Sequence, residues 1–267
     1  MEQKQRQLNL VLDINYGSRM KRWVYGILIL FLGCAPSELD DCFRSAGSTI
    51  TRSYEVAAFS KIRFENDVIL NVKQGDTQKV EVTSGSKLFE NISVVVEGET
   101  LVIKDKNSCN LVRDYGLTQV LVTTDRLTEI RNSSAYDVRS VGVLSFPSLV
   151  LRSDSSGGVE DSRKSGDFYL NLDCKEVRVQ ANGQSVFYLE GKAENAVISF
   201  ADEYPRFEGG DLAIDTLTVF HRGANKMIVR PKNVIQGRIV GVGDVIALER
   251  PAVVDVTEEF TGRLRFQ

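Results

Sequence analysis

Residues 182–207 read NGQSVFYLEGKAENAVISFADEYPRF and contain the clearest repeat in the chain. A turn-forming block, Asn182–Ser185, precedes an apolar run that begins at Val186, and a second block, Asp202–Pro205, precedes Phe207, 21 residues later. Such blocks recur in the second half of the chain, and the apolar residues that follow them are Val138, Val159, Val186, Phe207, Met227 and Val245. These anchors are 21, 27, 21, 20 and 18 residues apart. A repeat near 20 residues is typical of a solenoid, whose units are too short to bury their own apolar faces and therefore stack.

The length of the repeat also predicts the kind of unit. About 20 residues, at roughly 3.3 Å per strand residue, form two or three short strands joined by tight corners, as in a parallel β-helix. Gly and Asn in the turn blocks tolerate the positive φ angles that such corners need. We therefore predict an all-β fold, a right-handed parallel β-helix-like solenoid, with residues 42–267 as one domain. A β-sandwich, which also has strands every 8–12 residues, is the alternative.

The first half of the chain predicts a β-sheet region. Before Asn132, apolar residues alternate with polar ones over short runs that end in Gly, Asp or Asn, and no window from Tyr54 onward has helical periodicity. This N-terminal sheet is expected to cap one end of the solenoid, and the charged segment 255–267 is expected to cover the other, because an open coil leaves strand edges unpaired.

The N-terminal 41 residues predict export. Met20–Arg22 is positive, Trp23–Leu32 is apolar, and Gly33 precedes Cys34, which is the layout of a signal peptide. The apolar run is shorter than the roughly 20 residues that span a bilayer. Because the cysteine position resembles a bacterial lipobox, we predict a lipoprotein signal peptide at 20–33 and an acylated Cys34. The alternatives are an ordinary signal peptide with an incidental cysteine, or a short buried segment.

The segments on either side of this signal are interpreted from it. Residues 1–19 stand before a complete signal and are interpreted as a gene-model extension. Residues 34–41 form an acidic tether. The tether resembles the surface-export signal of Bacteroidetes lipoproteins, and a plain solvated linker is the alternative. The predicted location is therefore outside the cytoplasm, anchored at the outer membrane and either periplasmic or surface-exposed.

Composition and cysteine placement narrow the class of protein. The chain has 33 Lys and Arg against 36 Asp and Glu, so no basic excess favours nucleic acid as a partner. An exported chain can keep a disulfide. Cys42 and Cys109 both lie in polar, loop-like sequence and are predicted to pair, whereas Cys174 lies in a strand-like region and is interpreted as a buried thiol. No two cysteines have the close spacing of a zinc site.

The sequence offers little for catalysis. His221 is the only histidine, and it alternates with Leu217 and Val219, which is typical of a core histidine with a hydrogen-bond partner. Parallel β-helices do include glycosidases and lyases, and glycoside hydrolysis needs two carboxylates about 5–10 Å apart. The candidates for such a pair are Asp154, Glu160, Asp161, Asp167 and Asp173. We predict no catalytic activity and no cofactor or metal, with a carbohydrate-active enzyme as the alternative.

Aromatic residues in turns are the candidates for ligand contact. Tyr115, Tyr136 and Tyr204 lie in loop-like sequence, where aromatic rings stack on sugars or pack in interfaces. The alternative for each is a corner aromatic packed on its neighbouring coil.

Several stretches together resemble a known family. They are Asp41–Ser45, Phe59–Ile62, Val72–Asp76, Leu101–Ile103 followed by Cys109, and Ile239–Val245. In order and spacing they are similar to the putative auto-transporter adhesin, head GIN domain family, over roughly residues 42–250. The chain departs from the family at Ser133–Tyr136 and Ala201–Tyr204, which lack the glycines expected at corners. The resemblance implies a secreted or lipid-anchored β-solenoid. We predict that it binds a glycan or another surface protein, or serves as a structural spacer.

Overall fold

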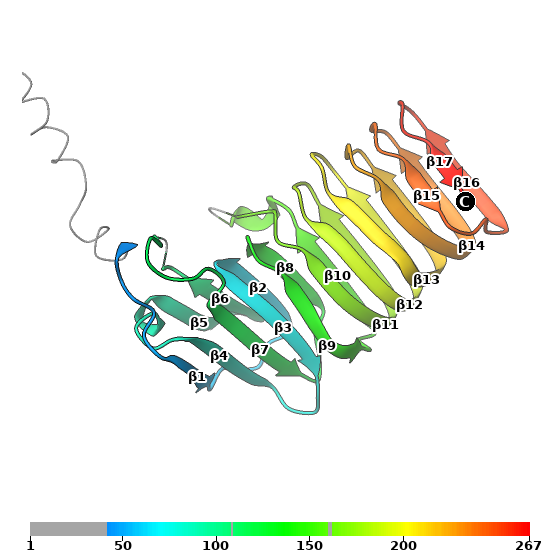
Figure 1. The fold of residues 1–267 in the computed structure, drawn as a ribbon. Coiled ribbons are helices and arrows are strands. Elements are labelled where there is room, and N and C mark those ends of the chain that lie inside the picture. Colours follow the sequence, from blue (N-terminus) through cyan, green and yellow to red (C-terminus); the bar gives the residue numbers. More distant parts are fainter. Residues whose placement is uncertain (1–41, 108, 160–161) are drawn as a thin grey trace, which may run out of the picture.

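The computed structural model describes residues 42–107, 109–159 and 162–267 (Figure 1). The predicted extension, signal peptide, lipidated Cys34 and acidic tether lie outside these residues. The all-β prediction is confirmed, because the described chain folds into 17 strands with two short 3₁₀ turns, η1 (Phe89–Asn91) and η2 (Ser156–Gly158). Within the same residues, no helix is long and apolar enough to cross a membrane.

The strands follow one another along the chain with short connections. They are β1 (Thr49–Tyr54), β2 (Lys61–Asn66), β3 (Val68–Gln74), β4 (Lys79–Gly85), β5 (Ile92–Glu97), β6 (Thr100–Asp105), β7 (Thr118–Thr124), β8 (Glu129–Ser134), β9 (Val138–Leu144), β10 (Ser148–Ser153), β11 (Phe168–Ala181), β12 (Val186–Phe200), β13 (Arg206–His221), β14 (Met227–Ile239), β15 (Val245–Ala247), β16 (Val253–Glu258) and β17 (Leu264–Phe266).

Strand pairing forms two ladders along the length of the molecule. The first ladder runs β1–β4–β7–β3–β9, continues through the first parts of β11 to β14, and ends with β15 and β17. The second ladder runs β5–β6–β2–β8–β10, continues through the second parts of β11 to β14, and ends with β16. All of these pairs are parallel except β1–β4, β4–β7 and β5–β6. A β-sandwich has antiparallel sheets, so the alternative fold does not describe this chain.

Two regions differ in how chain order maps onto these ladders. In the C-terminal stack, β11 to β17, each turn of chain lies directly on the turn before it. In the N-terminal region, β1 to β9, strand β2 lies between β6 and β8, and β3 lies between β7 and β9. The predicted N-terminal sheet is therefore a continuation of both ladders, and its antiparallel strands lie at one end of the molecule (Figure 1).

Inward-facing residues repeat in register along the first ladder. Phe168 lies opposite Val138 on one side and Phe187 on the other. The series continues through Phe207, Met227, Val245 and Leu264, with spacings of 19, 20, 20, 18 and 19 residues from Phe168 onward. All of them except the terminal Leu264 are fully buried, and the Phe168 and Phe187 rings stack with centroids 4.5 Å apart. Stacked apolar residues of this kind replace the core that one short coil could not form alone.

This register corrects two of the predicted anchors. Val138, Phe207, Met227 and Val245 belong to the series, and Val186 precedes the true position, Phe187, by one residue. The anchor at Val159 is wrong, because the chain leaves the ladder after β10 and the next strand begins at Phe168. The turn block at 155–158 therefore begins an inserted loop, which produced the irregular spacing of 27.

The C-terminal end of the molecule is built differently from the expectation. Residues 255–267 were expected to cover the last coil with charged residues, and that expectation is wrong. Instead, β16 pairs in parallel with β14, and β17 pairs in parallel with β15, so this segment adds one strand to each ladder.

The all-β class and the parallel ladders agree with the predicted solenoid. The more specific prediction, that the solenoid is a right-handed parallel β-helix, stays a prediction.

The predicted disulfide is present. Cys42 and Cys109 are bonded, with Cα atoms 4.4 Å apart, which ties the chain before β1 to the loop between β6 and β7. Cys174 is a free, buried thiol, and desolvation raises its pKa to about 11. It is therefore protonated and unreactive in the native protein at neutral pH.

Candidate functional site

Two tyrosines stack on the outer face of the first ladder. Tyr169 in β11 lies opposite Tyr188 in β12, and their ring centroids are 4.7 Å apart with 8° between the planes. From β9, on the other side of β11, the Arg139 guanidinium lies 4.1 Å over the Tyr169 ring. Side chains at one register position of neighbouring strands point to the same face, so this row of aromatic and cationic groups follows directly from the coil repeat.

A groove opens beside this pair because β13 bulges. Tyr188 pairs with Glu208 and Glu190 pairs with Asp211, so Gly209 and Gly210 stand where a regular strand has one residue. A surface groove of about 600 Å³ lies beside this bulge. It is lined by Ser140, Gly142, Tyr169, Leu170, Asn171, Tyr188, Leu189, Glu190, Glu208, Gly210, Asp211 and Ile228. Tyr188 keeps 39% of its surface exposed within it.

Three of the polar side chains that line the groove are carboxylates, those of Glu190, Glu208 and Asp211. Asn171 Nδ2 donates to Glu190 Oε1 at 2.8 Å, and Glu208 forms an ion pair with Arg206. Asp211 lies on the bulge and is exposed. Desolvation, followed by the charges of nearby carboxylates, raises the pKa of Tyr169, so its phenol stays neutral and can still donate a hydrogen bond. The groove therefore combines an aromatic floor with carboxylates at its wall.

The structure places the three predicted tyrosines elsewhere. Tyr115 and Tyr204 are exposed in loops, as expected, and Tyr136 is half-buried, with a hydrogen bond to the backbone of Gly116 beside Tyr115. None of the three lines the groove. The signal that could have found Tyr169 and Tyr188 was their 19-residue separation, which equals one coil and places two aromatics at the same outward position.

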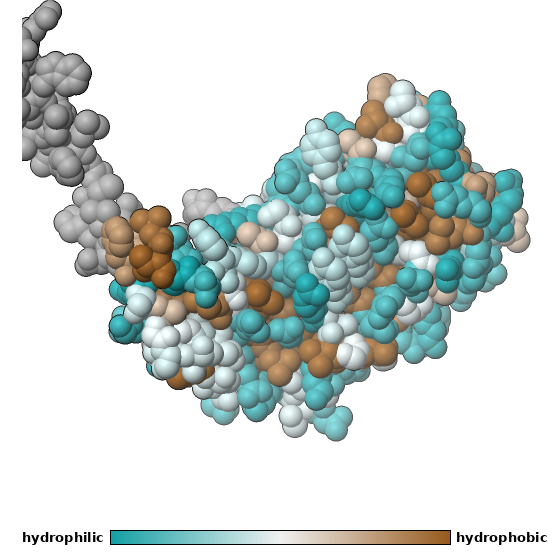
Figure 2. All heavy atoms as spheres, in the orientation of Figure 1, coloured by the Kyte–Doolittle hydropathy of each residue, from teal (hydrophilic) through white to brown (hydrophobic). Residues whose placement is uncertain are grey.

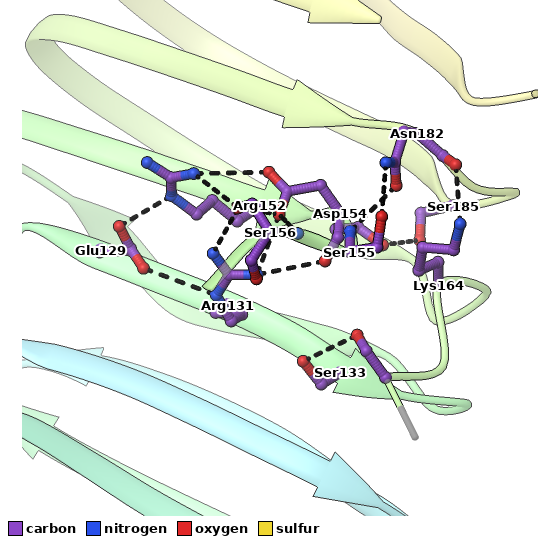
Figure 3. A network of polar contacts seen from close by, with 12 residues as sticks. Glu129, Arg131, Ser133, Arg152, Asp154, Ser155, Ser156, Lys164, Asn182 and Ser185 are labelled. Atoms are coloured by element: carbon purple, nitrogen blue, oxygen red, sulfur yellow. Dashed lines mark hydrogen bonds and ion pairs between the residues drawn. The ribbon is translucent and has the colours of Figure 1, made fainter. Parts of the chain in front are cut away.

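Glu129, Arg131, Arg152 and Asp154 form an ion-pair cluster that joins β8 to β10 (Figure 3). Arg131 and Arg152 lie opposite each other in register, which would be unfavourable without compensating charge. Asp154 Oδ1 lies 2.9 Å from Arg131 Nη1, and Glu129 Oε2 lies 2.9 Å from Arg152 Nε. Burial alone would raise the pKa of Asp154, yet hydrogen bonds from Ser156 and the charge of Arg131 hold it below its usual value.

The carboxylates considered for glycoside hydrolysis are not brought together in one site. Asp154 belongs to the ion-pair cluster, and Asp173 forms an ion pair with Lys192 at 3.2 Å in a different groove. Asp167 accepts the backbone N–H of Val186 at 2.8 Å, and desolvation raises its pKa. Glu160 and Asp161 lie outside the described residues. The side chains that are described also contain no cluster of three or more potential metal ligands.

His221 is a core residue, as its alternation predicted. It is fully buried at the end of β13, its Nε2 lies 2.8 Å from the carbonyl oxygen of Asn225, and its ring meets Phe200 edge-on. Its Nδ1 atom is buried and has no hydrogen-bond partner in the described part of the chain. Because desolvation disfavours the charged form, the pKa of His221 is lowered.

The corner without glycines at 201–204 is built with one strained residue. Glu203 adopts a φ of 57°, a conformation that glycine would take at little cost. Its side chain receives a hydrogen bond from Lys164 Nζ at 2.7 Å, and the peptide N–H of Ala224 bonds to its carbonyl at 2.9 Å. These contacts from neighbouring coils hold the departure from the family pattern in place.

Comparisons with solved structures show the same fold in other proteins. A putative adhesin from Bacteroides fragilis NCTC 9343 is 20% identical, with a TM-score of 0.73, and the match covers 84% of this chain and 100% of that chain. A putative adhesin from Parabacteroides distasonis ATCC 8503 is 15% identical, with a TM-score of 0.60 and coverage of 84% and 99%. A putative lipid binding protein from the same organism is 15% identical, with a TM-score of 0.58 and coverage of 82% and 97%.

No curated protein is significantly similar in sequence. The family model described as "Putative auto-transporter adhesin, head GIN domain" matches residues 58–251, which is most of the chain. The protein therefore belongs to the putative auto-transporter adhesin, head GIN domain family.

Proposed function

We propose that this protein is a lipid-anchored adhesin of the cell envelope that binds a glycan in the groove over Tyr169 and Tyr188. The observation that carries the proposal is the partly exposed ring of Tyr188, which lies in a groove lined by carboxylates. Aromatic rings pack against the C–H faces of sugars, and carboxylates accept hydrogen bonds from sugar hydroxyls.

The charge of the groove narrows the ligand class. Glu190, Glu208 and Asp211 line it. The two guanidiniums beside it are already paired, Arg206 with Glu208 and Arg139 with Asp137 at 2.7 Å. Bringing an anionic sugar against these carboxylates would be repulsive. We therefore infer neutral or amino sugars as the ligand, in preference to uronic or sulfated ones, and a volume of about 600 Å³ suits a short oligosaccharide segment.

Three further features support the location. The signal-like sequence ends at Gly33-Cys34, the family description is that of adhesins, and the Cys42–Cys109 disulfide fits an oxidising compartment outside the cytoplasm. The proposal places the acylated Cys34 at the outer membrane, on its periplasmic or its external side. It also takes the two ladders as faces of a right-handed parallel β-helix, which serves as the rigid support for the groove.

The groove is tested by glycan-array screening of the full chain, followed by calorimetry with the best ligand. Tyr188→Ala is expected to weaken binding at least tenfold, whereas Tyr204→Ala, an exposed tyrosine outside the groove, leaves it unchanged. Equal losses in both variants, or binding to no glycan, would contradict the proposal. Recovery of shortened glycan products would favour the alternative, a carbohydrate-active enzyme.

The anchor is tested separately by labelling cells with radioactive palmitate. The parent chain is expected to incorporate label and Cys34→Ala is expected to lose it. Unchanged labelling in the variant would exclude Cys34 as the acylated residue.

A further inference from the structure

Four large apolar side chains are exposed together at the end of the molecule where the described chain begins. Phe43, Leu111, Val112 and Tyr115 retain 62%, 68%, 55% and 74% of their surface, and we call them the N-terminal apolar patch. In Figure 2 brown apolar residues gather at this end, beside the point where the described chain starts. Exposed apolar groups gathered in one place usually mark an interaction surface.

Covalent and polar links hold the patch together. The disulfide joins Cys42, next to Phe43, to Cys109, and the backbone N–H of Leu111 donates to the carbonyl of Cys42 at 3.0 Å. The Arg113 guanidinium donates to the carbonyl of Arg44 at 3.2 Å and to that of Cys109 at 2.6 Å. These bonds fix the two segments in an arrangement that holds their apolar side chains in solvent, so the patch is preorganised for a partner.

Cationic side chains lie at the margin of the patch. Arg44 follows Phe43 in sequence and lies 3.9 Å from the exposed Glu90 carboxylate, and Lys87 Nζ donates to Ser45 Oγ at 3.1 Å. Aromatic and aliphatic groups flanked by Lys and Arg are the combination that binds at a membrane interface, where the apolar groups enter the acyl boundary and the cations meet headgroup phosphates.

We propose that the N-terminal apolar patch inserts into the headgroup boundary of the membrane that carries the lipid anchor. This inference rests on the proposed anchor at Cys34, which precedes Cys42 by eight residues. Eight residues reach at most about 29 Å, so an anchored chain holds the patch next to the bilayer surface. Insertion would fix the orientation of the molecule, with the far end of the C-terminal stack, opposite the patch in Figure 1, directed away from the membrane.

The test uses a single tryptophan as a depth probe in the full, lipidated chain. Trp23 is the only tryptophan in the sequence and belongs to the predicted signal peptide, so Tyr115→Trp leaves one reporter, in the patch, in the chain that begins at the acylated Cys34. The chain is reconstituted into vesicles of phosphatidylethanolamine and phosphatidylglycerol, with and without brominated acyl chains. A matched probe, Tyr204→Trp in the same background, places the reporter in an exposed loop of the C-terminal stack.

Bromolipid is expected to quench the reporter at position 115 at least twofold and to leave the reporter at 204 unchanged. Adding Leu111→Ser and Val112→Ser should abolish the quenching while the chain still floats with the vesicles. Flotation without quenching at 115 would overturn the insertion and leave the anchor standing. Failure to float would overturn both, and a concentration-dependent blue shift at 115 without lipid would assign the patch to a second copy of the chain instead.

Discussion

In the C-terminal stack each turn of the chain lies on the turn that precedes it, whereas in the N-terminal region β2 lies between two strands that come later in the sequence. Ile62 of β2 faces Leu101 of β6 on one side and Ile130 of β8 on the other. Paired residues in the stack are about one coil apart in sequence, whereas the residues paired with β2 and β3 are 39 to 68 positions away. The stack can therefore lose a coil locally, whereas β2 is secured only when both of its later neighbours are in place.

The outer faces of the two regions differ as well. Where β8 pairs with β10, Arg131 and Arg152 lie in register, and Asp154 and Glu129 neutralise their charges. The charged groups on this surface are therefore paired with one another. Farther along, the equivalent row on the first ladder carries Tyr169 and Tyr188, and the bulge at Gly209–Gly210 leaves it open. The same repeat thus forms a surface whose charges are paired with one another in one place and a groove in another.

The strongest test of the comparison is Phe64→Ala in β2. Phe64 is fully buried between the two later strands, and its truncation is expected to cost about 3–5 kcal/mol of unfolding free energy. Hydrogen exchange should show β2, β6 and β8 losing protection together. Val95→Ala, at an exposed position in the outer strand β5, is the control and should change stability by less than about 0.5 kcal/mol. Loss of protection confined to β2 would break the comparison.

A second test perturbs the C-terminal stack through Gly237→Ala in β14. Gly237 has a φ of 126°, and an added Cβ would lie 2.0 Å from the carbonyl oxygen of Val219 in the neighbouring coil. We expect a loss of about 2–3 kcal/mol, with exchange rising in β14 to β17 and staying unchanged in β2 to β8. Gly142→Ala, also at positive φ but with open space around it, should cost about 1 kcal/mol because only backbone strain is added. Cooperative unfolding of the whole chain in the Gly237 variant would contradict a locally separable stack.

The smallest expected effect is a pH dependence that arises within the stack. Burial lowers the pKa of His221 below its unfolded value, so below about pH 6.5 the unfolded chain takes up a proton that the native chain does not. Stability should therefore fall as the pH falls from about 7 towards 5.5, by at most about 1.4 kcal/mol per pH unit. Urea unfolding of the parent and His221→Gln isolates this contribution, because the carboxylates are common to both. Parallel stability curves for the two proteins would exclude His221 as the cause.

The sequence predicted the features that depend on local periodicity. Alternating apolar residues predicted strands, and the 20-residue spacing after Val186 predicted stacking, because each coil in that part must place an apolar side chain at the same point. It could not predict the position of β2 and β3, since nothing in their own alternation identifies strands far along the chain as neighbours. The prediction at Val159 was wrong because a local pattern does not reveal pairing. An inserted loop can contain turn residues followed by valine without forming a coil.

The candidate site was less accessible from sequence than the fold. Ligand contact was predicted for Tyr115, Tyr136 and Tyr204 because they lie in loop-like sequence. In a solenoid, however, the outward-facing residues of the strands also form surface that can bind a ligand. Tyr169 and Tyr188 look like ordinary members of alternating strands until their register is known. The groove also lies beside the bulge of β13, and a bulge is defined by the pairing of two strands, which the alternation of one strand does not reveal.

The uniform register of the C-terminal stack has a consequence for how such chains change in length over evolution. Gain or loss of one whole coil, about 20 residues, preserves every remaining pair and moves the far end by about 4.8 Å. Inserting a single residue within a strand would instead turn the inward residues that follow it to the outer face. Length variants that change the number of strands in the stack should therefore differ by whole coils, whereas other insertions should lie in loops, as between β10 and β11.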